Sequence, residues 1–406
     1  MNLFSRQRRM TPPPPAGISM PMEREHSGET PPVVRAAASD LDDPVRAIES
    51  IFRELDPPSL TGMILFCSSR YDLDRLAEAI ADRSEGLTVI GCTSSGEIAP
   101  DGLAEGTITA IGFPASDFTM GALRFDDLDH FDPAHAQQVV RALVAENVER
   151  ARAAGHTAGR AAIFLVDGLS HREEMLTVTV QDALGDIPLI GGSSGDGLDF
   201  KETFVLHDGA FRRDAALVAV LCSSRRMHAF RSQHYTPGEV KMVVTGADPV
   251  SRVVTEINAE PASAEYARLV GVKETELSLE LFALHPPMVR AGGEYYCRSI
   301  QSANPDGSLT FYCAIDEGIV LTLGEAHDVL AELGTLFDRL DETVGGIDRV
   351  IGFDCVLNSV ALTQQQIRHE VSALFARRRV AGFATYGEQF HALHVNQSFS
   401  GLAIGR

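Results

Sequence analysis

Residues 63–98 read MILFCSSRYDLDRLAEAIADRSEGLTVIGCTSSGEI, and this stretch decides the fold. An apolar strand is followed by a helix and then by a second strand that runs into a Gly/Ser/Thr loop. In the helical part Leu73, Leu76 and Ile80 share one face, and Asp72 stands at the N-cap position. The stretch therefore predicts a strand–helix–strand unit, with these bounds: 63–69, 72–84 and 87–98.

Two further copies of this unit follow along the chain, which indicates an internal repeat. The second copy consists of AAIFLVDG (161–168), a helix over 172–184 and IPLIGGSSGDG (187–197). The third consists of RVIGFDC (349–355), a helix over 364–377 and RVAGFATYGEQF (379–390). In the third helix Thr363 and Gln366 form a predicted capping box, and His369 falls on the solvent face. Each copy is followed by a further strand-like segment: GTITAIGF, DAALVAVLC and HVNQSFSGLAIG.

Turn residues also predict hairpins between these units. Asn304-Pro305-Asp306-Gly307 interrupts the apolar residues of 295–314, and Asp208-Gly209 stands at the centre of FVLHDGAF (204–211). Antiparallel hairpins between strand–helix–strand units imply mixed sheets. The predicted fold class is therefore mixed α/β, with two linked domains built from repeated strand–helix–strand units and hairpins.

The predicted domain boundaries follow composition and pattern. Residues 1–40 hold seven of the 20 prolines and little periodic apolar pattern, so they are expected to form a disordered tail. A join lies within 247–271, where a strand ends near Ile257 and a helix begins near Ser263. This places the N-terminal domain at 41–258 and the C-terminal domain at 259–406.

Composition narrows the classes of function. The formal net charge of -21 disfavours nucleic-acid backbones and anionic membranes as partners. No apolar run is long enough for a transmembrane helix, and the N-terminus lacks the apolar core of a secretory signal. The six cysteines form no C-x-x-C pair, which suits a reducing compartment. We expect a cytoplasmic protein; the sequence leaves self-association open.

The three Gly-rich loops that end the units are candidate ligand-binding segments. Paired glycines let a backbone turn sharply and approach a ligand, and the hydroxyls between them offer hydrogen bonds. The alternative interpretation is structural, because three copies of a loop are also what a folded scaffold needs. The candidate binding residues are Gly91, Thr93, Ser94, Gly96, Glu97, Gly192, Ser193, Tyr386, Gly387 and Glu388 in these loops, with Asn396 and Gln397 beyond the third.

A hydrolase is a further alternative, because Gly191-Gly-Ser193-Ser-Gly195 matches the G-x-S-x-G pattern of a nucleophile elbow. That motif requires a helix directly after the serine, whereas Asp196-Gly197 follows here and disfavours a helix. We therefore expect a binding protein rather than an enzyme, with no catalytic residues.

The C-terminal segment around His394 is the candidate metal site. His391 and His394 would point to opposite faces of a strand, so they are not expected to chelate one metal. A lone His394 is either structural or an axial haem ligand, with Tyr386 as an alternative ligand. The neighbouring aromatic residues would line such a pocket: Phe383, Tyr386, Phe390 and Phe399.

Several segments resemble the FIST family of signalling proteins. Similar to the N-terminal FIST domain are CSSRYDLDRLAEAI, VIGCTSSGEIAPDG and LIGGSSGDGLDFKETFV. Similar to the C-terminal FIST domain are EYARLVG, MVRAGGEYYCRSI, DRVIGFDC and VAGFATYGEQF. The resemblance covers about 60–405 and implies an intracellular sensor of small ligands. Family members often act beside a histidine kinase or a cyclic-di-GMP enzyme.

The tail TYGEQFHALHVNQSFSGLAIG is similar to that of FIST proteins that sense nitric oxide through haem. This resemblance implies haem b on His394 and nitric oxide as the signal. One departure is Cys355-Val-Leu-Asn358, where the family pattern has an arginine after the cysteine. The other interpretation is a haem-free sensor of a small metabolite such as an amino acid. The third is a hydrolase that uses Ser193.

Overall fold

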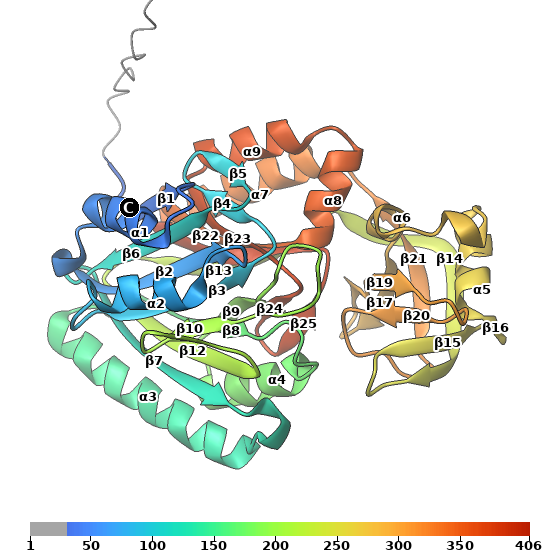
Figure 1. Ribbon diagram of the computed structural model, residues 1–406, viewed down its shortest axis with the longest axis horizontal. Coiled ribbons are helices and arrows are strands. Elements are labelled where there is room, and N and C mark those ends of the chain that lie inside the picture. The colour runs from blue at the N-terminus through green and yellow to red at the C-terminus, as the bar shows by residue number, and fades with distance from the viewer. Residues whose placement is uncertain (1–30) are drawn as a thin grey trace, which may run out of the picture. The chain divides into compact units, whose positions relative to one another are not determined.

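The computed structural model describes residues 31–406, in which one topological unit occurs three times (Figure 1). Each unit runs edge strand, helix, central strand, helix, parallel strand, hairpin and closing strand. Unit 1 consists of β1 (Arg35–Ser39), α1 (Pro44–Leu55), β2 (Leu60–Ser68), α2 (Leu73–Ala81), β3 (Thr88–Ser94), β4 (Glu97–Ala99), β5 (Gly102–Ala104) and β6 (Ile108–Pro114). Unit 2 consists of β7 (Phe118–Asp126), α3 (Pro133–Ala154), β8 (Gly159–Val166), α4 (Glu173–Leu184), β9 (Leu189–Ser193), β10 (Val205–His207), β11 (Ala210–Arg212) and β12 (Ala215–Ser223).

Unit 3 follows the same plan with two changes: its second helix is split, and a domain is inserted after its edge strand. It consists of β13 (Met227–Ser232), α7 (Val329–Val344), β22 (Ile347–Cys355), α8 (Val356–Gln364), α9 (Arg368–Arg377), β23 (Val380–Thr385), β24 (Glu388–Phe390), β25 (Leu393–Val395) and β26 (Phe399–Gly405). The repeat predicted from the sequence is confirmed in all three copies.

The three units exchange their hairpins in a cycle. In every unit the central strand pairs parallel with the strand after its helix and antiparallel with the closing strand. The hairpin of unit 1 (β4–β5) then extends the sheet of unit 3, that of unit 2 (β10–β11) extends the sheet of unit 1, and that of unit 3 (β24–β25) extends the sheet of unit 2. Each six-stranded sheet is thus completed by another unit.

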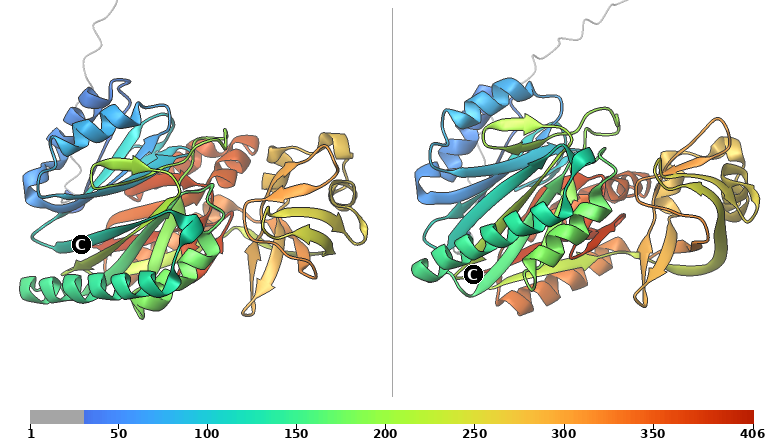
Figure 2. Two further views of the ribbon diagram at one scale, coloured as in Figure 1. Left: turned by 60° about the horizontal axis from the view of Figure 1, so that its bottom comes forward. Right: turned by 90° about the horizontal axis from the view of Figure 1, so that it is seen from below.

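The inner faces of the three sheets share one apolar core. Phe66 of unit 1 stacks on Phe383 of unit 3 with ring centroids 4.4 Å apart, and Phe353 meets both rings edge-on. Apolar side chains of unit 2, such as Ile163 and Leu165, complete this core. The helices lie on the outer faces: α1 and α2 on one sheet, α3 and α4 on the second, α7 and α9 on the third (Figure 2). The predicted mixed α/β class is confirmed.

The inserted domain is a small antiparallel β-structure with its own core. It consists of β14 (Tyr235–Asp248), β15 (Val253–Ile257), β16 (Glu260–Pro261), α5 (Ala262–Val270), α6 (Leu279–Leu284), β17 (Pro287–Ala291), β18 (Glu294–Cys297), β19 (Ile300–Ala303), β20 (Leu309–Phe311) and β21 (Val320–Ala326). The buried guanidinium of Arg252 ties it to the start of α4, at 2.6 Å from Glu173 and 2.7 Å from Glu174.

The predicted helix over 364–377 is confirmed as α9, but its start is wrong. α9 begins at Arg368, because α8 ends at Gln364 and Gln366 adopts a left-handed φ of 59° between the two helices. Thr363 therefore belongs to the last turn of α8, where its hydroxyl donates to the carbonyl of Ser359, and the predicted capping box does not form. His369 is exposed, as predicted.

The predicted tail over 1–40 also needs correction. Residues 1–30 lie outside the described residues, but Arg35–Ser39 form β1, which pairs with β6 at the edge of the first sheet. Val34 is fully buried, and the N–H groups of Val33 and Val34 donate to Asp348 of unit 3. The predicted boundary at 258/259 falls inside the inserted domain, between β15 and β16.

Other sequence predictions are confirmed: the hairpins at Asp208-Gly209 and at 304–307, and the strand that ends at Ile257. All six cysteines are buried and free. Over the described residues, no helix combines the length and the apolar character needed to cross a membrane.

Candidate ligand-binding site

The three Gly-rich loops meet at the carboxyl ends of the parallel strands, where they are joined by backbone hydrogen bonds. Loop 1 donates to loop 3 through Ser95 N to Ala384 O (3.0 Å), and loop 2 donates to loop 1 through Gly195 N to Thr93 O (3.1 Å). Loops 2 and 3 are joined by Ser193 N to Gly387 O (2.8 Å) and Tyr386 N to Ser193 O (3.2 Å). The loops that the sequence singled out are therefore one contiguous structure.

An open cleft of about 520 Å³ lies beside this loop cluster. Its walls come from the ends of β2 and β3, from loop 2, from α8 and from α6 of the inserted domain. The hydroxyl groups in its lining belong to Ser68, Ser69, Ser94, Ser95, Ser359 and Thr363. Open α/β sheets bind ligands at the carboxyl ends of their strands, so this position favours a binding site.

Asp196 shapes one wall of the cleft. Its carboxylate accepts hydrogen bonds from the hydroxyl of Tyr386 and from the N–H groups of Phe200, Lys201 and Glu202. Burial alone would raise the pKa of Asp196, but these hydrogen bonds outweigh burial and lower the pKa below its ordinary value. Asp196 therefore stays ionised and fixes the path of loop 2.

Two predicted site residues, Glu97 and Glu388, do not line the cleft. They are buried, and their carboxylates hold the hairpins in place through hydrogen bonds. Glu97 accepts from Ser94 and from the N–H and hydroxyl of Thr107, both at 2.9 Å. Glu388 occupies the same place in unit 3, where Thr385 and Ser398 donate at 2.5 and 2.7 Å. Each carboxylate ties the start of its hairpin to the residue before the closing strand.

Gly96 and Gly387 are glycines for different reasons. Gly96 lines the cleft and has a φ of 133°, which favours glycine. The φ of Gly387 is not positive. A Cβ at this position would instead lie 2.3 Å from Cε1 of His394 and 2.9 Å from the amide nitrogen of Asn396. Gly387 therefore makes room for the His394 ring.

His394 is 4 % exposed and part of a polar network inside the protein. The amide nitrogen of Gln389 lies 3.1 Å from its Nδ1 and 2.9 Å from the hydroxyl of Ser193. Because burial lowers the pKa of His394, the ring is neutral at pH 7, and its Nε2 has no hydrogen-bond partner among the described residues. His391, in contrast, is exposed at the tip of the β24–β25 hairpin.

This arrangement does not fit haem b. An iron-ligating histidine needs a free Nε2 lone pair and a hydrogen-bond acceptor at Nδ1, whereas His394 has a donor facing Nδ1. The four aromatic residues expected around the haem lie in four places. Phe383 stacks on Phe66, Phe399 on Phe375, Phe390 meets His391, and Tyr386 meets Phe200. Burial raises the pKa of Tyr386 well above its usual range, which disfavours a tyrosinate ligand.

Ser193 is not placed as a hydrolase nucleophile. It is 1 % exposed at the end of β9, and its hydroxyl is bonded to Gln389 instead of to a histidine. An activated serine needs a base within hydrogen-bond reach.

Most other predicted residues hold the scaffold together. Thr93 accepts from the N–H of Phe204 at 3.0 Å, and Gln397 bonds Ser299 and Ala283, both at 2.8 Å. Gly91 and Gly192 leave no room for a Cβ against neighbouring strands, and Asn396 is buried beside Gly387. Of the predicted binding residues, Ser94 and Gly96 line the cleft.

The sequence reasoning missed the cleft residues Ser68, Ser69, Ser95, Glu280 and Ser359. A signal was present for the first two, because Ser68 ends the central strand of unit 1 beside Ser94 of the first Gly-rich loop and Ser69 follows it. Glu280 and Ser359 come from α6 and α8, two helices that the sequence pattern did not reveal.

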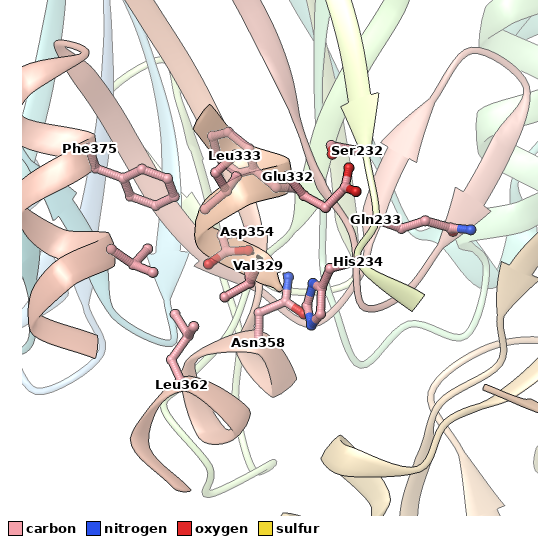
Figure 3. Close-up of a pocket in the computed structure, with 12 residues that line it drawn as sticks. Ser232, Gln233, His234, Val329, Glu332, Leu333, Asp354, Asn358, Leu362 and Phe375 are labelled. Atoms are coloured by element: carbon pink, nitrogen blue, oxygen red, sulfur yellow. Dashed lines mark hydrogen bonds between the residues drawn. The ribbon is translucent and has the colours of Figure 1, made fainter. Parts of the chain in front are cut away.

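A second cavity, of about 20 Å³, lies on the opposite face of α8 (Figure 3). Asn358 and Leu362 face this cavity, whereas Ser359 and Thr363 face the cleft. Asp354 of β22 also lines it, and burial raises the pKa of Asp354 to about 7. The volume suits about one water molecule, and Oδ1 of Asn358 has no partner among the described residues.

Comparison with protein families gives two matches. The FIST N domain model matches residues 61–260, and the FIST C domain model matches residues 262–391. A search of curated proteins finds no match to this sequence.

Proposed function

This chain belongs to the FIST family, whose domains are linked to signal transduction and small-ligand sensing, and from that premise we propose that it is a sensor of a small polar ligand. The ligand binds in the cleft beside the Gly-rich loops. The protein then acts by changing its contact with a separate signalling protein rather than by catalysis.

The cleft is the observation that carries this proposal. It is lined by unit 1, unit 2, unit 3 and the inserted domain together, through Ser94, Asp196, Ser359 and Glu280. A ligand there touches parts of the chain that are far apart in sequence. Its binding energy can therefore favour one arrangement of these parts over another, which is what a sensor requires.

For the partner we propose a histidine kinase or an enzyme of cyclic-di-GMP signalling in the cytoplasm, on the basis of the family resemblance. Nitric oxide sensing through haem is the competing hypothesis, and the donor that faces Nδ1 of the buried His394 counts against it. An absorption spectrum of the purified protein separates the two: a stoichiometric Soret band that His394→Ala removes would favour haem.

The test of the cleft is a thermal-shift screen of small metabolites, followed by calorimetry. Ser359→Phe places a ring in the cleft from the surface of α8 and should abolish binding of any hit. Ser50→Phe is the matched control, because Ser50 is a half-buried helical serine on α1, away from the cleft. If Ser359→Phe binds every hit as the parent does, the cleft is not the ligand site.

A further inference from the structure

The charges around the cleft point to the class of ligand. The charged side chains in its lining are three carboxylates, Glu105, Asp196 and Glu280, and the lining contains no Lys, Arg or His. Glu105 is neutralised by Arg368, whose Nη2 lies 2.7 Å from the carboxylate. A further cation, Arg70, packs against Gly106 of the lining and pairs with Asp42. Two carboxylates of the lining therefore lack a cationic partner in the described residues.

Asp196 and Glu280 contribute in different ways to the negative charge of the cleft. The four hydrogen bonds that Asp196 accepts use both of its oxygens fully, so it supplies negative charge rather than a direct contact. Glu280 is an exposed residue in the first turn of α6. Its own backbone N–H and the hydroxyl of Ser278 lower the pKa of Glu280, so it is ionised at neutral pH.

A hydroxyl without a partner completes the site. Ser95 is a half-buried residue of the lining, and its Oγ packs against Gly195 and has no hydrogen-bond partner among the described residues. A serine hydroxyl can accept a hydrogen bond from an ammonium group. Hydroxyls with ionised carboxylates form a lining that accepts hydrogen bonds from a cation and repels an anion.

We propose that the cleft binds a small organic amine, with Glu280 as the direct partner of the ammonium group and Asp196 as a supporting negative charge. This inference rests on the proposed ligand-sensing function and adds the ligand class. Phosphates, nucleotides and dicarboxylates are disfavoured by the same charges. The long-range part of the attraction weakens with salt, because Glu280 is exposed.

Three four-carbon probes of similar length test the charge preference directly: putrescine, 1,4-butanediol and succinate. Isothermal calorimetry on the full chain at low salt should detect putrescine, with weaker or no binding of the diol and none of succinate. Glu280→Gln should weaken putrescine binding at least tenfold. Glu239→Gln is the control, because Glu239 is an exposed glutamate of the same inserted domain on β14, outside the lining.

The outcomes separate this inference from the proposed function. Binding of succinate that Ser359→Phe abolishes would overturn the amine assignment and leave the cleft as the ligand site. The amine assignment would also be overturned if neither putrescine nor a longer diamine binds at a ligand concentration of about 10 mM, which is about 10⁴ times a micromolar Kd. Putrescine binding that neither Glu280→Gln nor Ser359→Phe changes would place the amine elsewhere and count against both proposals.

Discussion

The amide nitrogen of Asn358 donates a 2.7 Å hydrogen bond to Oδ1 of Asp354, across the junction between α8 and β22. The same amide donates to the carbonyl of Ser398, whose hydroxyl is bonded to Glu388. Two buried carboxylates, on a central strand and on a hairpin, are thus linked through two polar side chains. Asp354 is the only carboxylate at this position of the three central strands. The equivalent residue is Cys67 in unit 1 and Val166 in unit 2.

Asp354→Asn should change the pH dependence of stability. The folded protein holds a proton on Asp354 up to about pH 7, whereas the unfolded chain loses it near pH 4. The folded state therefore binds more protons between these values, and stability falls as pH rises through this window. The variant removes this loss and should be more stable at pH 8 by roughly 2–4 kcal/mol.

Thermal unfolding at pH 5 and pH 8 measures this effect. Asp101→Asn is the control, because Asp101 is an exposed residue of the β4–β5 turn. Parallel pH profiles for the parent and Asp354→Asn would contradict the prediction.

Glu388→Gln should act in the same direction and over a wider range, because burial raises the pKa of Glu388 to about 8. The charge of Asp354 contributes to this rise. The double variant should therefore gain less stability at pH 8 than the sum of the two single variants. Additive effects in this double-mutant cycle would show that the two carboxylates titrate independently.

Gly387→Ala should destabilise the protein by about 1–3 kcal/mol, because its Cβ collides with the His394 ring. Adding His394→Ala should recover part of this loss, since the ring is the obstacle. Gly334→Ala on α7 is the control: a Cβ there meets nothing within 4 Å, and alanine favours the helix. Equal stability of Gly387→Ala and the parent would show that the collision is absent.

A chain that begins at residue 40 should be less stable than one that begins at residue 31. The shorter chain loses β1, the buried Val34 and the bonds to Asp348, which together should lower stability by at least about 2 kcal/mol. Thermal unfolding of the two chains tests this. Identical melting temperatures would mean that β1 adds nothing to the first sheet.

The units could be predicted because their strands and helices carry strong local patterns. In α2, Leu76 and Ile80 are buried and Asp72 caps the helix, as the spacing indicated. The start of α8 could not be found in this way, because it follows β22 directly and Cys355 gives no side-chain cap. A helix without a turn or a polar cap before it leaves little trace in the sequence.

The site was harder to predict because the short hairpins pair across units. Each hairpin strand has three residues, too few for a pattern that names its partner. The glutamates beside the loops suggested ligand contacts. In the structure Glu97 and Glu388 instead accept hydrogen bonds that hold the hairpins in place. The cleft depends on where α6 and α8 come together, which the local sequence does not encode.

The cyclic exchange of hairpins has a consequence for synthesis on the ribosome. The first sheet requires β10–β11, the second requires β24–β25, and the third requires β4–β5. The second sheet therefore stays incomplete until residue 395 has left the exit tunnel, while β4 must wait for β23. Contacts across such sequence distances close slowly. The nascent chain therefore has an open edge on its second sheet until β24 and β25 are made, and open edges of this kind are prone to aggregation.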